Sequence, residues 1–296
     1  MKRVLIITWY WPPSGGAGVQ RWLKFSKYLP ANGWEPVILT VDPAYASYPQ
    51  TDERLIDEIP PSIEVFRTKA STGIFSAYKK ITGSSEIPYG GFVNESNPGF
   101  LKKFLRFIRG NFFLPDSRRG WNRYAYKSAI RIIREKSIDA VITTSPPHST
   151  QLTGLKLSKK LNIKWIADLR DPWTEIYYSG EMYQTLPARW INSRLESSVL
   201  KKAGRVIATC PATARLFKSK LGSSSDTGKV ISVTNGYDES DFSEEKEKPD
   251  RFVITYLGTL AASYDLSLLS AALRQCSTGL NGELILRFIG KADATV

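Results

Sequence analysis

Short apolar runs alternate with longer stretches of helical periodicity through most of this sequence of 296 residues. Val4-Leu5-Ile6-Ile7 is one such run, and after it Val19, Trp22 and Leu23 recur on one helix face with charged residues between them. Strands that alternate with helices predict an α/β fold with a parallel, doubly wound sheet. We expect strands at residues 4–7, 36–41, 63–66, 140–143, 164–167, 205–209 and 229–233, and helices at 19–29, 100–112, 121–133, 151–161, 186–202 and 211–221.

A second, shorter series of elements follows residues 238–250, which have the composition of a linker. Strands are expected here at 252–257 and 283–288, and a helix at 266–276. About 45 residues are too few to bury a good core alone, so this unit is either the start of a domain that is cut off or a unit that packs on the first domain. We divide the chain into domains at 1–248 and 249–296, the second being incomplete, and interpret residues 71–99 as a long surface excursion.

A glycine-rich loop follows the first strand after the six-residue approach from Trp9 to Ser14. Bare glycines let a ligand come close to the backbone, and amides at a helix start favour anions. Gly15 and Gly16 therefore predict a loop that accommodates an anion such as phosphate, although glycines also serve in plain tight turns. Arg21, on the first helical turn, either pairs with that phosphate or is solvated.

The same glycines invite comparison with a dinucleotide-binding fingerprint. Gly16-Ala17-Gly18 begins the pattern G-x-G-x-x-G, and Asp42 ends the second strand where a ribose-binding acid is expected. The third glycine position is Arg21, however, and the approach from the strand is long. These departures disfavour a nicotinamide or flavin cofactor.

Three further loops follow predicted strands, at residues 145–149, 168–173 and 235–238. Because the carboxyl ends of parallel strands share one edge of a sheet, we expect these loops to meet the glycine loop there. His148 is the single histidine, which excludes a multi-histidine metal site. It either contacts a sugar hydroxyl or a leaving phosphate, or is a partly exposed loop residue.

Asp168, Arg170 and Asp171 lie close together at a strand end. A carboxylate there can bind or deprotonate a sugar hydroxyl, and Arg170 can pair with phosphate. The alternative is an internal ion pair that braces the loop. No P-loop, no zinc-ligand spacing and no Ser-His-Asp arrangement of recognisable local form is present.

Positive charge is concentrated in the first 234 residues. The formal net charge is +13; residues 235–250 carry −5 and residues 251–296 carry +1, which leaves +17 for the rest. Such a field attracts nucleotide phosphates, nucleic acid or an anionic membrane surface.

The predicted helix at 100–112 is basic and amphipathic, so it is either a membrane-surface element or a helix packed on the core with its lysines in water. Its apolar face holds Phe100, Leu101, Phe104, Leu105 and Ile108, and its candidate membrane-facing residues are Lys102, Lys103, Arg106 and Arg109.

Compartment signals favour the cytoplasm. The two cysteines, Cys210 and Cys276, exclude a disulfide framework and favour a reducing compartment. The first apolar run is too short for a signal peptide, and no stretch reaches the ~18 apolar residues of a spanning helix.

Six motifs, taken in order and spacing, resemble the glycosyltransferase family 4 type of GT-B enzyme. Each motif is weak by itself, and together they cover the first domain and the opening of the second. They are Trp11–Gly18 with Gln20 and Arg21; Thr144–Ser149; Asp168–Trp173; Glu196 with Ala203–Ile207; Thr234–Asp238; and Tyr256–Leu260.

The resemblance implies two Rossmann-like domains across a cleft, the first holding the acceptor and the second the nucleotide-sugar donor. It implies sugar transfer with retained anomeric configuration, without a metal or other cofactor. The site residues expected are His148 and Asp168 as catalytic residues, and Gly15, Gly16, Arg21, Ser145, Arg170, Asp171 and Asn235 as substrate-binding residues.

This sequence departs from the family pattern in three places. The family's usual histidine lies a few positions earlier than His148, no basic residue follows Leu260 within residues 261–265, and the Glu-rich donor-binding motif is absent. We therefore expect the chain as given to be inactive or nearly so.

The leading hypothesis is the acceptor-side portion of a cytoplasmic, membrane-peripheral glycosyltransferase acting on a polysaccharide or lipid-linked acceptor. The alternative is a non-catalytic module that binds a glycan or a lipid-linked sugar. A nucleic-acid partner is not expected, because the basic and aromatic stretch Arg119–Tyr124 is not accompanied by an RNA- or DNA-binding motif.

Overall fold

The computed structural model describes residues 1–71, 100–176, 179–222, 226–242, 251–260, 265–277 and 284–292. The chain forms two compact units, Met1–Ile87 with Phe104–Gly236, and Pro88–Lys103 with Tyr237–Val296. Most of the predicted surface excursion at 71–99, most of the linker at 238–250 and the proposed domain boundary at 248 lie outside the described residues.

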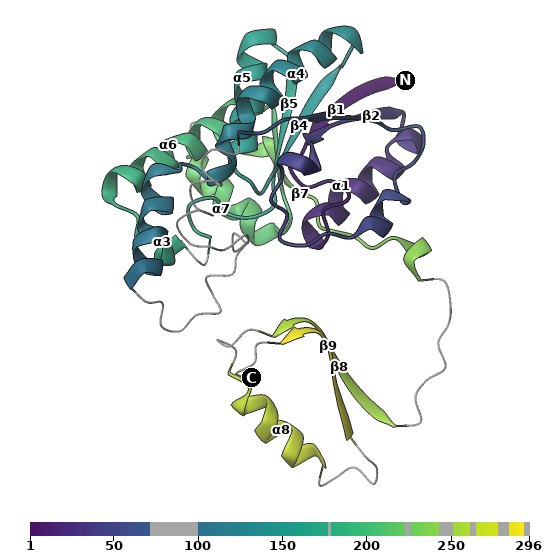
Figure 1. Ribbon diagram of the computed structural model, residues 1–296, viewed down its shortest axis with the longest axis vertical. Coiled ribbons are helices and arrows are strands. Elements are labelled where there is room, and N and C mark those ends of the chain that lie inside the picture. Colours follow the sequence, from purple (N-terminus) through teal and green to yellow (C-terminus); the bar gives the residue numbers. More distant parts are fainter. Residues whose placement is uncertain are drawn as a thin grey trace. The chain divides into compact units, whose positions relative to one another are not determined.

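The first unit is built on a single sheet of seven parallel strands in the order β3-β2-β1-β4-β5-β6-β7 (Figure 1). The order reverses direction beside β1, as in doubly wound folds, so the predicted fold class is confirmed. The strands are β1 (Lys2–Ile7), β2 (Trp34–Val41), β3 (Glu64–Thr68), β4 (Ala140–Ser145), β5 (Lys164–Leu169), β6 (Arg205–Ala208) and β7 (Val230–Ser232).

Helices cover both faces of this sheet. Along one face α4 packs on α5, α5 on α6 and α6 on α7. The connection from β1 to β2 crosses the sheet in the opposite direction, so a right-handed crossover places α1 on the other face. The helices are α1 (Ala17–Tyr28), α3 (Phe100–Phe112), α4 (Asn122–Glu135), α5 (Ser149–Leu161), α6 (Leu186–Lys202) and α7 (Pro211–Leu221).

The central strands form the middle of the core. Val4 through Ile7 of β1 are buried, and Leu5 pairs with Val37 of β2 on one side and Val141 of β4 on the other. A strand covered on both faces has no solvent-facing side, and its sequence is therefore continuously apolar instead of alternating. The same burial continues through all six residues of β4.

The second unit contains one βαβ unit, as the sequence predicts. Its described elements are β8 (Phe252–Leu260), α8 (Ser267–Ser277) and β9 (Leu284–Ala292). The two strands run parallel, in register from Phe252 with Leu284 to Leu260 with Ala292.

A glycine in α5 sets how closely that helix approaches the sheet. A Cβ atom on Gly154 would lie 2.1 Å from Nε1 of Trp165 in β5 and 2.8 Å from Cγ2 of Thr143 in β4. The indole N–H of Trp165 donates a 2.8 Å hydrogen bond to Oγ1 of Thr143 beneath the helix. Any larger residue at 154 must therefore displace a buried, hydrogen-bonded pair.

Replacing Gly154 by alanine is expected to destabilise the fold by about 1–3 kcal/mol, because the overpacking outweighs the ~1 kcal/mol that alanine gains in helix propensity. Urea unfolding of Gly154→Ala against wild type measures this. Gly236→Ala is the matched control, since no atom lies within 4 Å of the Cβ it adds. An unchanged free energy of unfolding for Gly154→Ala would contradict the packing described here.

Candidate functional site

The loops that follow β1, β4, β5 and β7 meet at the carboxyl edge of the first unit's sheet, as the sequence predicts. Two arginines join them. Arg21 of α1 reaches the end of β5 and the segment after β7. Arg170, just after β5, reaches the glycine loop and the end of β4. The edge is therefore one connected set of backbone and side-chain contacts.

Arg21 and Asp168 form a buried ion pair at the centre of this edge. Nη2 of Arg21 lies 3.1 Å from Oδ1 of Asp168, and the two side chains are 1% and 0% exposed. Trp22 Nε1 and Thr144 Oγ1 each donate a 2.8 Å hydrogen bond to Oδ2 of the same carboxylate. Nη1 of Arg21 donates a hydrogen bond to Oδ1 of Asn235 at 2.8 Å.

Three predicted site residues are thus partners of one another. Arg21 is neither solvated nor free for phosphate, and Asn235 accepts its hydrogen bond. Asp168 would have to give up one of its present partners to reach a substrate. The internal ion pair, which the sequence had left open for the carboxylates of this loop, forms through Arg21 of α1 instead of the neighbouring Arg170.

Arg170 holds two loops by their backbone. Its Nε donates to the carbonyl of Ser145 at 2.9 Å and its Nη1 to the carbonyl of Gly18 at 2.8 Å. Its own carbonyl accepts from Thr209 Oγ1 at 2.8 Å. No partner among the described residues takes its Nη2, which leaves donors for an anionic or hydroxyl group of a substrate.

Asp171 differs from Asp168 in having no hydrogen-bond partner within the part of the chain that the structure describes. Burial raises the pKa of its carboxyl, the Arg170 guanidinium lowers it, and the Asp168 carboxylate raises it again. The net shift is upward. A carboxyl with a raised pKa and open acceptor positions at a sheet edge is suited to bind a sugar hydroxyl.

His148 is buried, not partly exposed. The residue is 9% exposed, and its ring stacks on Trp173 with the ring centroids 5.0 Å apart. Neither ring nitrogen finds a hydrogen-bond partner among the described residues. Burial and the nearby charges of Arg170 and Lys220 lower its pKa to about 3. The imidazole is therefore neutral at pH 7, able to donate one hydrogen bond and accept another.

The glycine loop ends in an uncapped helix. Gly16 is the N-cap of α1 at φ 80°, a backbone conformation that glycine adopts without strain, and no side chain caps the helix. The amide of Gly15 already donates to the carbonyl of Gln50 at 2.8 Å. Anion binding is therefore possible at the amides after Gly15, at the start of α1.

The basic helix α3 does not present the face that the sequence predicts. Arg106 is 2% exposed and its Nη1 lies 2.7 Å from Oε2 of Glu181, so it cannot face a membrane. Phe100 and Phe104, which pack inward in the second of the two alternatives for this helix, are 86% and 50% exposed. Lys103 is exposed and Arg109 half-buried.

The fit of α3 against residues 179–185 explains this orientation. Gly110 lies directly against Met182, and Asn111 bonds to the backbone of Tyr183 and Thr185. The side chain of Lys102 lies outside the described residues.

Sequence reasoning missed several side chains of the edge. Trp22 and Thr144 complete the Asp168 contacts, and Trp173 provides the stacking surface for His148. A tryptophan on the inner face of a helix signals only core packing, so its hydrogen bond was not predictable. Ser145, a predicted substrate residue, is buried and donates from Oγ to the carbonyl of Asp168 at 3.4 Å.

Within the described residues, no group of three or more His, Cys, Asp or Glu side chains is arranged to hold a metal ion.

Residues 105–236 match the family described as glycosyl transferase 4-like domain. No curated protein matches the sequence. Among solved structures, a sucrose-phosphate synthase from Thermosynechococcus elongatus is similar with a TM-score of 0.51 at 13% identity, over 100% of this chain and 64% of that one. Arabidopsis thaliana UGT89C1, complexed with UDP-L-rhamnose, is similar with a TM-score of 0.51 at 13% identity, over 98% of this chain and 69% of that one.

A lipopolysaccharide outer core galactosyltransferase, WaaB, gives a TM-score of 0.51 at 11% identity, over 99% of this chain and 62% of that one. At identities this low, the structural similarity shows a shared fold alone. The chain spans less than two thirds of the length of the synthase and of WaaB.

Breaking the buried ion pair is expected to be costly. Asp168→Asn leaves the Arg21 charge buried without its partner, which should lower the free energy of unfolding by about 3–5 kcal/mol. The double variant Arg21→Met with Asp168→Asn should lose less than the sum of the single losses, because the two groups interact directly. Denaturant unfolding measures all three.

The matched control is Arg3→Met, which breaks the partly exposed pair of Arg3 with Glu35 and should have a much smaller effect. Additive losses for Arg21 and Asp168 would contradict a coupled pair.

Acid should destabilise the protein through His148. Its folded pKa of about 3 lies below the ~6.5 of an unfolded histidine, so the unfolded state binds more protons between these values. This contribution is complete above the unfolded pKa and is lost as pH falls, by about 1.4 kcal/mol per pH unit. His148→Phe keeps a ring on Trp173 but does not titrate. Urea unfolding at about pH 7 and about pH 5 should show that the free energy of unfolding falls less in the variant than in wild type. An equal fall in both proteins would refute this account.

Proposed function

We propose that this chain is the acceptor-side part of a glycosyltransferase, because residues 105–236 match the family described as glycosyl transferase 4-like domain, in agreement with the family 4 resemblance of the sequence. It moves a sugar from a nucleotide-sugar donor to a polysaccharide or lipid-linked acceptor. The observation that carries the proposal is the carboxyl edge itself, where four loops are joined by Arg21 and Arg170. Open parallel sheets bind their ligands at this edge.

Acceptor binding is proposed at Asp171, Arg170 and His148. Asp171 accepts the acceptor hydroxyl's hydrogen bond, Arg170 offers its unused Nη2, and the neutral imidazole of His148 donates to an oxygen. The Arg21–Asp168 pair holds the loops in place. Because the half-buried Asp171 carboxyl has a raised pKa, it can also receive the hydroxyl proton as the new bond forms.

The donor is proposed to be a nucleoside diphosphate sugar. Its diphosphate suits the uncapped start of α1 and the positive field of the first 234 residues. Among proteins of similar fold, UGT89C1 is complexed with UDP-L-rhamnose and WaaB is a galactosyltransferase. Transfer is proposed to retain the anomeric configuration and to proceed without a metal, as the family 4 resemblance implies.

A cytoplasmic place of action, at the inner face of a membrane, is part of the proposal. The two cysteines and the basic first unit support it. In the part of the chain that the structure describes, no helix has both the length and the apolar character needed to span a bilayer.

The test is transfer of labelled sugar by the protein that carries this chain, from a panel of UDP-, GDP- and TDP-sugars to polysaccharide and membrane-lipid extracts. Asp171→Asn should lower turnover about a hundredfold while nucleotide-sugar binding is kept, because it removes a group that acts on the acceptor hydroxyl. The matched control is Asp57→Asn, because Asp57 is exposed and is not one of the proposed site residues.

Chelation of divalent metals should leave the rate unchanged, and NMR of the product should show the donor's anomeric configuration. Residues 1–296 alone are expected to transfer little, since no Glu-rich donor motif follows Leu260 in them. The second candidate, a binding module, predicts binding of glycan or lipid-linked sugar with no transfer to any acceptor in the panel. That result would reject the enzymatic proposal.

A further inference from the structure

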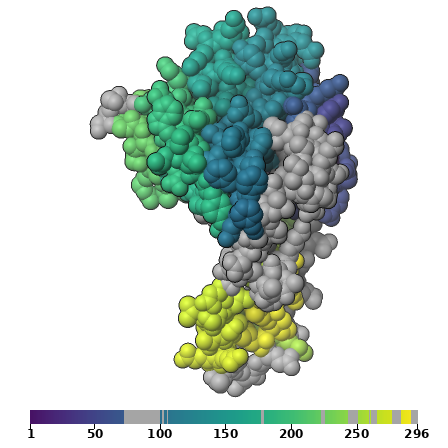
Figure 2. All heavy atoms as spheres, turned by 60° about the vertical axis from the view of Figure 1, so that its left-hand side comes forward, coloured from purple at the N-terminus to yellow at the C-terminus, as the bar shows by residue number. Residues whose placement is uncertain are grey.

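A groove lies on the helical layer of the first unit, and none of the residues proposed for catalysis lines it. Its volume is about 820 Å³, and it runs between α3, α4, α5 and α6. Figure 2 turns this side forward, with the blue surface of α3 beside the green surface of α6. We call it the basic groove; its lining includes Phe112, Arg119, Arg123, Lys127, Lys156 and Ile191.

Among the residues that the structure describes, four cations line the basic groove and no acid does. Arg119, Arg123, Lys127 and Lys156 come from the turn before α4, from α4 and from α5, and all four are exposed. None forms an ion pair with a carboxylate of the described residues. Within the described parts of the chain, Arg119 and Arg123 donate to neutral oxygens, of Leu114 and Tyr124. This cluster of like charge is complementary to an anion.

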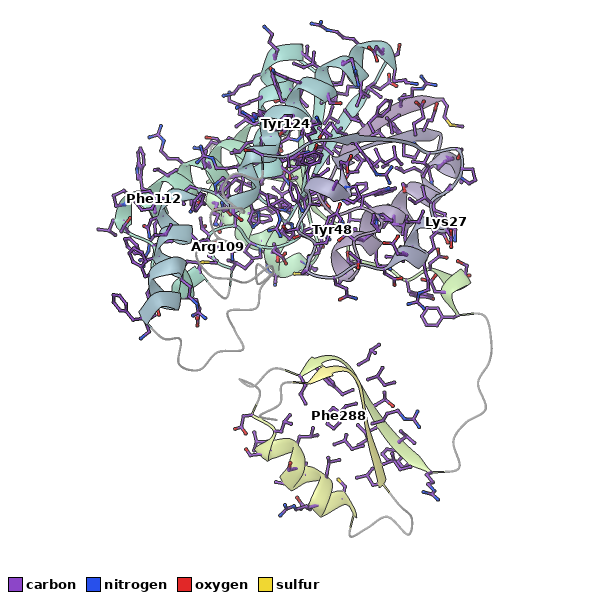
Figure 3. The ribbon with its side chains drawn as sticks, viewed as in Figure 1. Lys27, Tyr48, Arg109, Phe112, Tyr124 and Phe288 are labelled. Carbon is purple, nitrogen blue, oxygen red and sulfur yellow. The ribbon has the colours of Figure 1, made fainter. Side chains whose placement is uncertain are left out.

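Most of the other residues that line the groove are apolar, and the apolar part reaches the surface. The exceptions are Asn111, Asn122 and Tyr126. Phe112 of α3, which lies on the outer side of the molecule, is 68% exposed (Figure 3). Ile191 of α6 lines the groove beside it, and the neighbouring Trp190 is 60% exposed. A free phosphate ion offers these side chains nothing to contact. An amphipathic anion, charged at one end and apolar at the other, satisfies both parts of the groove.

The walls of the groove are held firmly enough to keep this shape. The ion pair of Arg106 with Glu181 and the bonds of Asn111 to Tyr183 and Thr185 fix α3 against the segment that leads into α6. At the other wall, Asn122 donates a 2.7 Å hydrogen bond to the carbonyl of Ser149, which joins the starts of α4 and α5.

We propose that the basic groove binds the headgroup and upper acyl chain of an anionic phospholipid in a bilayer. The cations contact the phosphate, and Phe112, Trp190 and Ile191 enter the acyl boundary. This proposal rests on the proposed action at a membrane, and it assigns the membrane contact to a particular surface of the first unit. The wall formed by α4 and α5 begins near the carboxyl edge of the sheet, because α5 starts directly after the loop that carries His148. A bilayer seated here lies beside the proposed acceptor site.

Vesicle co-sedimentation of the chain tests this, with phosphatidylcholine vesicles alone or containing phosphatidylglycerol. Wild type should bind only the anionic vesicles. Lys127→Glu with Lys156→Glu should weaken that binding by about tenfold or more, because each charge near an anionic surface contributes measurably. The matched control is Lys159→Glu with Lys160→Glu, which makes the same charge change on exposed residues of α5 that do not line the groove.

If the control loses less vesicle binding than Lys127→Glu with Lys156→Glu, the result supports the groove. An equal loss of binding in both double variants overturns the proposal in favour of a general effect of net charge. Ile191→Asn should also weaken binding; no effect would overturn the apolar contact. Release of the protein from vesicles by millimolar inorganic phosphate at constant ionic strength would overturn the lipid in favour of a free anion. These measurements need no sugar transfer, so an inactive protein that binds as described rejects the enzymatic proposal alone, and an active protein with equal losses rejects only the groove.

Discussion

The first unit depends on one buried ion pair. Arg21 lies on α1, on one face of the sheet, and Asp168 lies near the end of β5, two strands away from the strand that precedes α1. A buried carboxylate and guanidinium are tolerated only when both are paired and hydrogen-bonded, and here Trp22, Thr144 and Asn235 complete the set. The ion pair therefore joins α1, and with it the glycine loop, to the end of β5.

The pair also separates two tasks among neighbouring acids. The Asp168 carboxylate accepts hydrogen bonds that join the loops at the carboxyl edge of the sheet, whereas the Asp171 carboxyl keeps its acceptor positions and has a raised pKa. Arg170 makes the same division within one side chain, since two nitrogens hold backbone carbonyls and the third has no partner among the described residues. Groups that hydrogen-bond within the protein and groups that remain available to a ligand therefore lie next to one another in residues 168–171. A precise binding site needs such support for its ligand-binding groups.

Positive charge is divided in a similar way. Arg106, in the most basic stretch of the chain, is neutralised by Glu181 and fixes α3. The cations that stay available are Arg119, Arg123, Lys127 and Lys156, which three separate segments bring to one groove. The +17 of the first 234 residues is thus partly structural and partly open to an anionic partner.

The sequence by itself determined the strand and helix pattern, the parallel sheet and the meeting of the strand-end loops, because apolar periodicity and chain order fix these locally. It could not determine which charges pair. Arg21 and Asp168 are 147 positions apart, and α3 turned its phenylalanines outward because Arg106 and Gly110 fit residues 181–182. Only the tertiary structure decided these contacts, since they depend on which side chains the folded chain brings within a few ångströms of one another.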